Sequence, residues 1–406
     1  MRDPAATLAG SFVADSALAE RFADPVEAVT AVEGSARRPR HLLHSALEFL
    51  LVGGGTLLLL PLLWACRAGL GLDEAELLIG AFGFHAASLI NDPHFSVTYL
   101  LFYKDAKHRA LGNVYGPAQR ARYWAAGVVA PLLLVAWAGA ALASASAHAL
   151  GLLIQLMFLL VGWHYVKQAF GVLIVLSSRR GVSFTRYERR LVLAHCFAAW
   201  AYAWASPYDA GTKSVVNGVF YQTLPHPPGL ELVAASAFGV SALLLLGSLV
   251  QKRRREARWP PLAALSGLLI SVWVWTVFSR IDPLLAYLIP ALHSLQYLYF
   301  VWLLTRNAAR EAEGPPAFKG SVQRQLVLLS GSALALGWLL LRGLPAWLDE
   351  ALVLTDESGL SAPAAIGPTP YLAAFVAVVN LHHYFMDYVI WRRDHPDMRH
   401  LASYAE

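Results

Sequence analysis

The sequence predicts an all-α polytopic membrane protein with about ten transmembrane helices and with both termini in the cytoplasm. Its 406 residues are 57% hydrophobic and only 15% charged, and the mean hydropathy is +0.48. Soluble domains carry about 25% charged residues. The apolar runs are continuous and about 20 residues long, as membrane-spanning helices are. The strands of a membrane β-barrel instead alternate in segments of about ten residues, so a barrel is excluded.

Ten apolar stretches form a predicted transmembrane domain over residues 42–391. Cytosolic tails are expected at 1–41, with a weak amphipathic helix over Phe12–Val32, and at 392–406. An outer connection, 207–228, contains Val215–Leu224, which is apolar enough to dip into the membrane. The ten spans are expected at 42–65, 76–103, 122–144, 149–178, 189–206, 229–250, 261–279, 283–305, 325–343 and 370–391.

The basic residues indicate the orientation of these helices. With the N-terminus inside, 27 of the 32 Lys and Arg residues fall in cytoplasmic segments. Only Arg67, Lys213, Arg280 and Arg342 fall outside, and Lys167 lies within a span. This asymmetry follows the positive-inside rule, so we expect an integral protein of a bacterial inner membrane, with the lipid bilayer as its partner. The net charge of +5 is dispersed among loops, so no nucleic-acid partner is expected.

Histidines recur in four of the five helices that run from outside to inside. His85, His164, His293 and the pair His382 and His383 lie roughly 13–23 Å from the outer ends of their spans, at 1.5 Å per residue. That depth is near the middle of a hydrocarbon core about 30 Å thick. Because neutral histidine is a favoured ligand of iron, copper and zinc, imidazoles at one level predict a metal site. A single histidine in a membrane helix is more often an interhelical hydrogen-bond partner, and that alternative applies to each of them.

Two carboxylates share faces with these histidines. Asp387 lies four residues after His383, and Asp92 lies seven after His85, so each is a candidate ligand or orienting group. Adjacent helical residues diverge by about 100°. His382 and His383 therefore cannot serve one site equally, and Asp387 favours His383.

A proline interrupts the second span at Asn91-Asp92-Pro93-His94. Proline removes a backbone donor and disfavours helix for the residue before it, so the helix is expected to kink or unwind at Asn91–Asp92. His94 lies nine residues after His85, on the opposite face of a straight helix, and a break would make it a possible ligand. Without the break it would lie nearer the cytosol, level with His195, a less favoured candidate.

Three further polar groups lie close to these histidines in the sequence and are candidates for proton transfer. They are Tyr384, Tyr165 and Lys167. Lys167 is equally suited to be a counter-charge to Asp92 or Asp387. Neither cysteine belongs to a metal-binding motif, which argues against an iron–sulfur cluster and a thiolate-ligated haem.

The lone His85 and His293, and His164 followed by an aromatic residue, resemble the histidine pattern of the Brp/Blh-type carotene dioxygenases. The resemblance implies a polytopic fold, a non-haem iron held by histidines and an apolar substrate. The histidine–phenylalanine–glycine pattern of that family is not reproduced, and His382-His383-Tyr384 has no clear counterpart in it.

These observations lead to an expected function: a non-haem iron oxidoreductase or oxygenase acting on a lipid or isoprenoid-like apolar substrate, with an electron donor as a further partner. A b-type haem electron-transfer protein, or a site for another transition metal, is the cofactor alternative. A proton- or ion-coupled transporter would use Asp92, Lys167, His293 and Asp387 as a relay. A glycolipid or polyprenyl transferase is a further alternative, but the acidic residues of the outer loops in this sequence form no recognisable motif.

Overall fold

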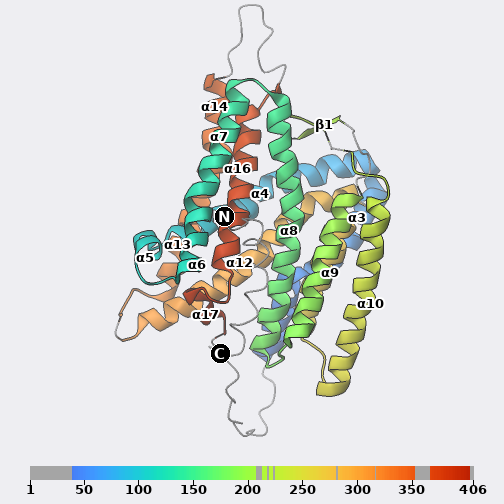
Figure 1. The fold of residues 1–406 in the computed structure, drawn as a ribbon, viewed down its shortest axis with the longest axis vertical. Coiled ribbons are helices and arrows are strands. Elements are labelled where there is room, and N and C mark those ends of the chain that lie inside the picture. The colour runs from blue at the N-terminus through green and yellow to red at the C-terminus, as the bar shows by residue number, and fades with distance from the viewer. Residues whose placement is uncertain are drawn as a thin grey trace, which may run out of the picture. The chain divides into compact units, whose positions relative to one another are not determined.

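The computed structural model describes residues 39–206, 213–216, 219–222, 225–279, 282–315, 317–352 and 366–402. Almost all of these residues are helical (Figure 1). Within them, seven helices are long and apolar enough to cross a membrane. The chain is therefore an α-helical membrane protein. The predicted helix over Phe12–Val32 lies outside the described residues.

Each of the ten predicted spans coincides with a helix, and several of these helices contain a π-helical segment, marked η. In chain order the elements are α2 (Pro39–Phe49), η2 (Leu50–Gly54) and α3 (Gly55–Leu70); α4 (Leu72–Tyr103); α6 (Pro117–Trp124), η3 (Ala125–Val129) and α7 (Ala130–Ala143); α8 (Ala147–Arg179); α9 (Arg186–Ala205); α10 (Leu230–Glu256); α11 (Leu262–Leu269) and η4 (Ile270–Val277); α12 (Pro283–Glu313); α13 (Val322–Trp338), η5 (Leu339–Gly343) and α14 (Leu344–Leu352); and α16 (Pro370–Ile390).

Three of these ten helices are not among the seven that qualify as spans by length and composition. α11 with η4 is too short, while α4 and α9 carry too many polar residues for their length. In α4 the polar residues include Asn91, Asp92 and His94, which lie in its second half. The count of ten spans and the cytoplasmic termini thus remain predictions.

The chain is not wholly helical, because the outer connection after α9 contains a β-hairpin. β1 (Lys213–Val216) and β2 (Val219–Gln222) pair antiparallel, with Val215 opposite Phe220. β2 packs against α8, and Val219 is fully buried in an apolar cluster with residues of α7, α8 and α16. The described part of the segment expected to dip into the membrane thus forms a hairpin on the helical unit. Its valines and the aromatic pair Phe220-Tyr221 are residue types enriched in strands.

The described part of the predicted C-terminal tail, up to residue 402, contacts the helices. It contains η6 (Pro396–Met398) and α17 (Arg399–Ala402). Arg109, at the end of α5 (Ala106–Leu111), donates to Asp397 at 2.8 Å, and the Tyr115 hydroxyl lies 2.7 Å from His395 Nε2. Burial lowers the pKa of His395 to about 4, despite the nearby carboxylate of Asp397, so this imidazole is neutral at pH 7.

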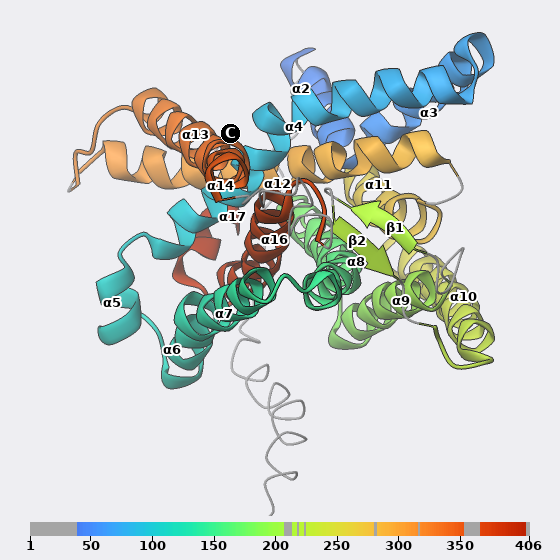
Figure 2. The ribbon, with the colours of Figure 1, turned by 90° about the horizontal axis from the view of Figure 1, so that it is seen from above.

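Helix α16 has a central position that allows it to carry the site. It packs against α4, α7 and α8, and Figure 2 shows it between these elements. The same view shows α4 and α12 along most of their length and α8 nearly end-on, so α4 and α12 are strongly inclined to α8. Residues far apart along α4 and α12 can therefore lie level with the middle of α8.

Helix α4 does not unwind at its proline, contrary to the prediction. It is helical without interruption from Leu72 to Tyr103, with Pro93 inside. Helix α13 packs closely against α4 at this point. A Cβ on Gly337 would lie 2.7 Å from both the carbonyl carbon and the oxygen of Asp92. Only glycine allows α13 to approach the α4 backbone this closely.

We expect Gly337→Ala to destabilise the protein by about 1–3 kcal/mol, because overpacking forces backbone shifts. Gly331→Ala on the same helix is the matched control, since no atom lies within 4 Å of the position its Cβ would take. The control should be neutral or stabilise α13 by about 0.5–1 kcal/mol. Unfolding of both purified variants in detergent measures the difference. Equal stability of the two variants would show that the close approach is unimportant.

Candidate metal centre

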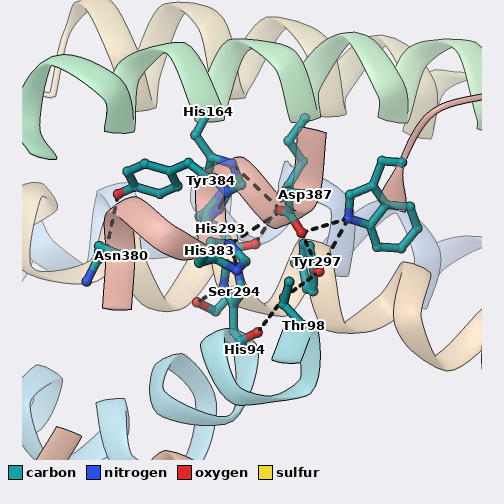
Figure 3. Close-up of polar contacts among 12 residues, drawn as sticks. His94, Thr98, His164, His293, Ser294, Tyr297, Asn380, His383, Tyr384 and Asp387 are labelled. Atoms are coloured by element: carbon teal, nitrogen blue, oxygen red, sulfur yellow. Dashed lines mark hydrogen bonds and ion pairs between the residues drawn. The ribbon is translucent and has the colours of Figure 1, made fainter. Parts of the chain in front are cut away.

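Four histidines from four helices converge on one buried point (Figure 3). His94 comes from α4, His164 from α8, His293 from α12 and His383 from α16. Asp387, one turn after His383, completes the group. None of these five side chains belongs to a residue that is more than 7% exposed. We call them the histidine–aspartate cluster.

The ring nitrogens of the cluster face one another in pairs. His94 Nε2 lies 2.9 Å from His383 Nε2, and His164 Nε2 lies 3.0 Å from His293 Nε2. Asp387 Oδ2 lies 3.3 Å from His383 Nε2 and 3.8 Å from His164 Nδ1. Donor atoms of two triads, His94/His164/His293 and His164/His383/Asp387, each fall within 4.8 Å of one another.

These separations are those of hydrogen bonds between neutral imidazoles, and they also fit metal ligands in two candidate triads that share His164. Two nitrogens bound at about 2.1 Å lie about 3 Å apart when the angle at the metal is near 90°, and about 3.4 Å apart at the tetrahedral angle. The observed pairs at 2.9 and 3.0 Å match the first case. The donor set of imidazole nitrogens and one carboxylate suits iron, and a two-histidine, one-carboxylate triad is the ligand set of non-haem iron oxygenases. The residues therefore fit a non-haem metal.

Two buried nitrogens of the cluster also lack partners. Among the described residues, neither His293 Nδ1 nor His383 Nδ1 has a hydrogen-bond partner. An unsatisfied buried polar group costs about 1–3 kcal/mol, so a protein rarely keeps two in one place without a reason. The two nitrogens of an imidazole point in different directions, so an ion held by the Nε2 atoms would not itself satisfy these Nδ1 atoms.

Other side chains fix the orientation of His94. Its Nδ1 lies 2.7 Å from the hydroxyl of Ser294, which itself donates to Asn91 Oδ1 at 2.9 Å. The ring stacks on Tyr297 with centroids 4.3 Å apart. A metal-binding histidine is generally held this way through its second nitrogen, so Nε2 of His94 is the atom presented to the cluster.

Asp387 is held by two donors. Tyr297 donates its hydroxyl proton to Oδ1 at 2.8 Å, and Trp391 Nε1 donates to the same oxygen at 3.1 Å. The Tyr297 oxygen also lies 2.6 Å from Thr98 Oγ1. The contacts to Oδ1 leave Oδ2 directed at the histidines.

We expect Tyr297→Phe to weaken metal binding by about 10–100-fold, the usual effect of losing a group that orients a ligand. Phenylalanine keeps the stacking on His94 and removes only the hydroxyl. Tyr299→Phe is the control, because Tyr299 donates to Glu48, outside the cluster. Titration with a competing chelator measures both affinities. Equal affinities would show that the hydroxyl does not support the site.

Three predicted ligands lie outside the cluster. His85 is exposed on α4, on the face away from His94, as nine residues of unbroken helix require. His382 donates from Nε2 to the Ala126 carbonyl at 3.0 Å, and its Nδ1 lies 3.0 Å from the Tyr99 hydroxyl. The carboxylate of Asp92 accepts from Arg342 Nε at 3.0 Å.

The less favoured His195 also has a structural role. Its Nδ1 lies 3.0 Å from Ser241 Oγ, and its ring stacks on Phe238. It therefore joins α9 to α10 and is not part of the cluster.

Two of the three predicted proton-transfer residues lie beside the cluster, and the third does not. Tyr384 stacks on His164 with centroids 4.7 Å apart and donates to Asn380 Oδ1 at 3.2 Å, and the Tyr165 ring lies 4.2 Å from that of His293. Both tyrosines border the cluster. Lys167 is half-buried with Nζ 6.0 Å from the Phe170 ring. Asp92 has Arg342 as its ion-pair partner instead of Lys167.

Sequence reasoning missed Ser294, Thr98, Trp391 and Arg342. The positions of two of these in the sequence could have identified them: Ser294 is adjacent to His293, and Trp391 lies four residues after Asp387 and so shares its face. Thr98 lies four residues after His94, which is a weaker indication. Nothing in the sequence pointed to Arg342, because it was assigned to an outer loop.

The fold and the cluster define the chain as an α-helical membrane protein with a buried histidine–aspartate centre. No protein-family model, curated protein or solved structure matches it. The resemblance to carotene dioxygenases therefore rests on its histidine pattern alone.

Proposed function

We propose that this protein is a membrane-embedded oxidoreductase that uses non-haem iron and acts on a lipid or isoprenoid-like apolar substrate. The observation that carries the proposal is the convergence of four buried imidazoles and one carboxylate from four helices. Buried ionisable groups in membrane helices are costly and usually mark function. Binding of one metal ion would explain why five ionisable side chains are buried together.

The spacing of the nitrogens favours non-haem iron over a b-type haem. Two histidines on opposite sides of a haem iron would place their nitrogens about 4 Å apart, at about 2.0 Å from the metal on each side. Both Nε2 pairs here are about 1 Å closer than that. Such pairs suit neighbouring positions around one ion.

In this proposal each residue has a defined part. His94, His164, His293 and His383 would hold the metal, and Asp387 would be either a fifth ligand or the acceptor that orients His383 and His164. The chemistry that iron would supply there is oxygen activation. Tyr297 donates a hydrogen bond to Asp387 and so holds this carboxylate in place. Tyr384 and Phe95 flank the histidines and exclude water.

The proposal includes the membrane topology. We propose that the protein crosses a bacterial inner membrane ten times and that both termini lie in the cytoplasm, because the basic residues gather on one side. Labelling of a cysteine introduced at position 67, compared with one at position 254, tests it in intact cells of a variant that lacks the native Cys66 and Cys196. Labelling of position 254 from outside would contradict the topology.

Metal analysis and an absorption spectrum of the full-length protein in detergent test the function. We expect about one iron per chain and no Soret band. A Soret band would select the haem alternative instead. A folded protein with no transition metal after iron-supplemented expression would overturn the metal proposal and favour a transporter or a structural role for the cluster.

A further inference from the structure

Helix α12 also borders an apolar pocket, on a face that does not reach the histidine–aspartate cluster. This pocket of about 280 Å³ is formed between this helix and the segment α2–η2. Leu47 and Leu51 form one wall, and Leu295, Leu298 and Trp302 form the other. From Leu295 to Trp302 the wall runs two helical turns, about 10 Å at 1.5 Å per residue. The pocket is thus an elongated groove along α12.

One carboxylate lies in the groove, and its charge is balanced. Glu48 is buried, its Oε1 lies 2.6 Å from Arg180 Nη2, and its Oε2 accepts from the Tyr299 hydroxyl at 2.8 Å. Arg180 is itself exposed at the end of α8. The Glu48–Arg180 pair leaves no net negative charge in the groove.

Further arginines stand at the Trp302 end. The Arg306 guanidinium lies 5.0 Å from the Trp302 ring centre. Arg179 donates to the carbonyl oxygen of Leu401, a neutral group, and its charge acts on both Tyr299 and Arg306. The nearest acid on α12, Glu311, is paired with Arg399 and His400. This end of the groove is therefore positively charged, and it lies on the side that we expect to face the cytoplasm.

We infer that the groove binds one anionic phospholipid. Its phosphate would lie against Arg179 and Arg306, and one acyl chain would follow Leu298 and Leu295 toward the membrane interior. Basic pockets between transmembrane helices on the cytoplasmic side are suited to anionic headgroups. The arginines would match the phosphate at headgroup level, and the apolar wall that runs inward from them would match the acyl chain. The inference does not depend on the metal centre.

Native mass spectrometry of the full-length protein in detergent, titrated with phosphatidylglycerol, phosphatidylcholine or glycerol phosphate, tests the inference. We expect one phosphatidylglycerol to bind at least about ten times more tightly than phosphatidylcholine, since two arginines each contribute about five-fold. Glycerol phosphate should not bind measurably, because it has no acyl chain. Arg306→Gln should weaken phosphatidylglycerol binding about five-fold.

The control is Arg254→Gln, which removes the same charge from the exposed end of α10, outside the groove. It should bind like the wild type. Leu298→Trp fills the groove and should abolish binding even if the arginine variant does not fold. Equal affinity for the two phospholipids, or unchanged binding by Leu298→Trp, would overturn the inference. Binding of glycerol phosphate alone would also overturn it, by showing a simple anion site.

Discussion

His94→Ala should remove most of the bound metal, whereas His85→Ala on the same helix should leave the metal content unchanged. His94 presents Nε2 to the cluster, 2.9 Å from His383 Nε2, while His85 is exposed. Loss of a direct ligand should weaken binding by more than the 10–100-fold typical of a supporting residue. Both substitutions remove one imidazole from α4, but only His94 is buried in the cluster. Metal content per folded chain measures the difference.

The other cluster histidines extend this comparison. His383→Ala should behave like His94→Ala, and the adjacent His382→Ala should keep its metal, although it loses hydrogen bonds to Tyr99 and Ala126. Folding is monitored by size-exclusion chromatography and circular dichroism. Equal metal loss from His85→Ala and His94→Ala would place the site elsewhere.

Arg342→Gln should destabilise the folded protein by about 3 kcal/mol, the lower end of the cost of leaving a buried charge unpaired. Asp92 is almost fully buried, with 4% of its side chain exposed, against 23% for Arg342. Arg342 also donates to the Phe84 carbonyl and stacks on the Phe84 ring. Removing the arginine therefore leaves the carboxylate without its counter-charge.

The double variant Asp92→Asn with Arg342→Gln separates charge from packing. It has no unpaired charge, so it should recover most of the lost stability. Asp92→Asn alone should cost less than Arg342→Gln, because the partly exposed guanidinium can still reach water. Unfolding of the three variants in detergent measures these differences. A double variant as unstable as Arg342→Gln would show that the ion pair is not the cause.

Much of the cluster could be predicted because helices obey regular geometry. Charge asymmetry gave α8, α12 and α16 a common direction, and residue counting placed His164, His293 and His383 at one depth. The structure brings these three together. The i,i+4 relation favoured His383 over His382, and the structure places His383 beside Asp387 because the two share a face.

The choice between His85 and His94 could not be made from spacing. Depth counting assumed that every helix runs along the membrane normal, but both α4 and α12 are strongly inclined to α8 (Figure 2). The assumption therefore failed for His293 as well, although His293 does lie in the cluster. The proline was also expected to break α4, and Gly337 instead lets α13 pack on an unbroken helix. Long-range partners such as Arg342 for Asp92 depend on tertiary packing, for which one sequence carries no local signal.

X-ray absorption at the iron edge of the purified full-length protein tests the central claim most directly. The account predicts iron bound by nitrogen and oxygen at about 2.0–2.2 Å, with the multiple scattering of several imidazoles. His85→Ala should give the wild-type spectrum, whereas purified His94→Ala should carry too little iron to give one. Iron bound by sulfur or by a porphyrin, or a wild-type protein without imidazole scattering, would contradict the account.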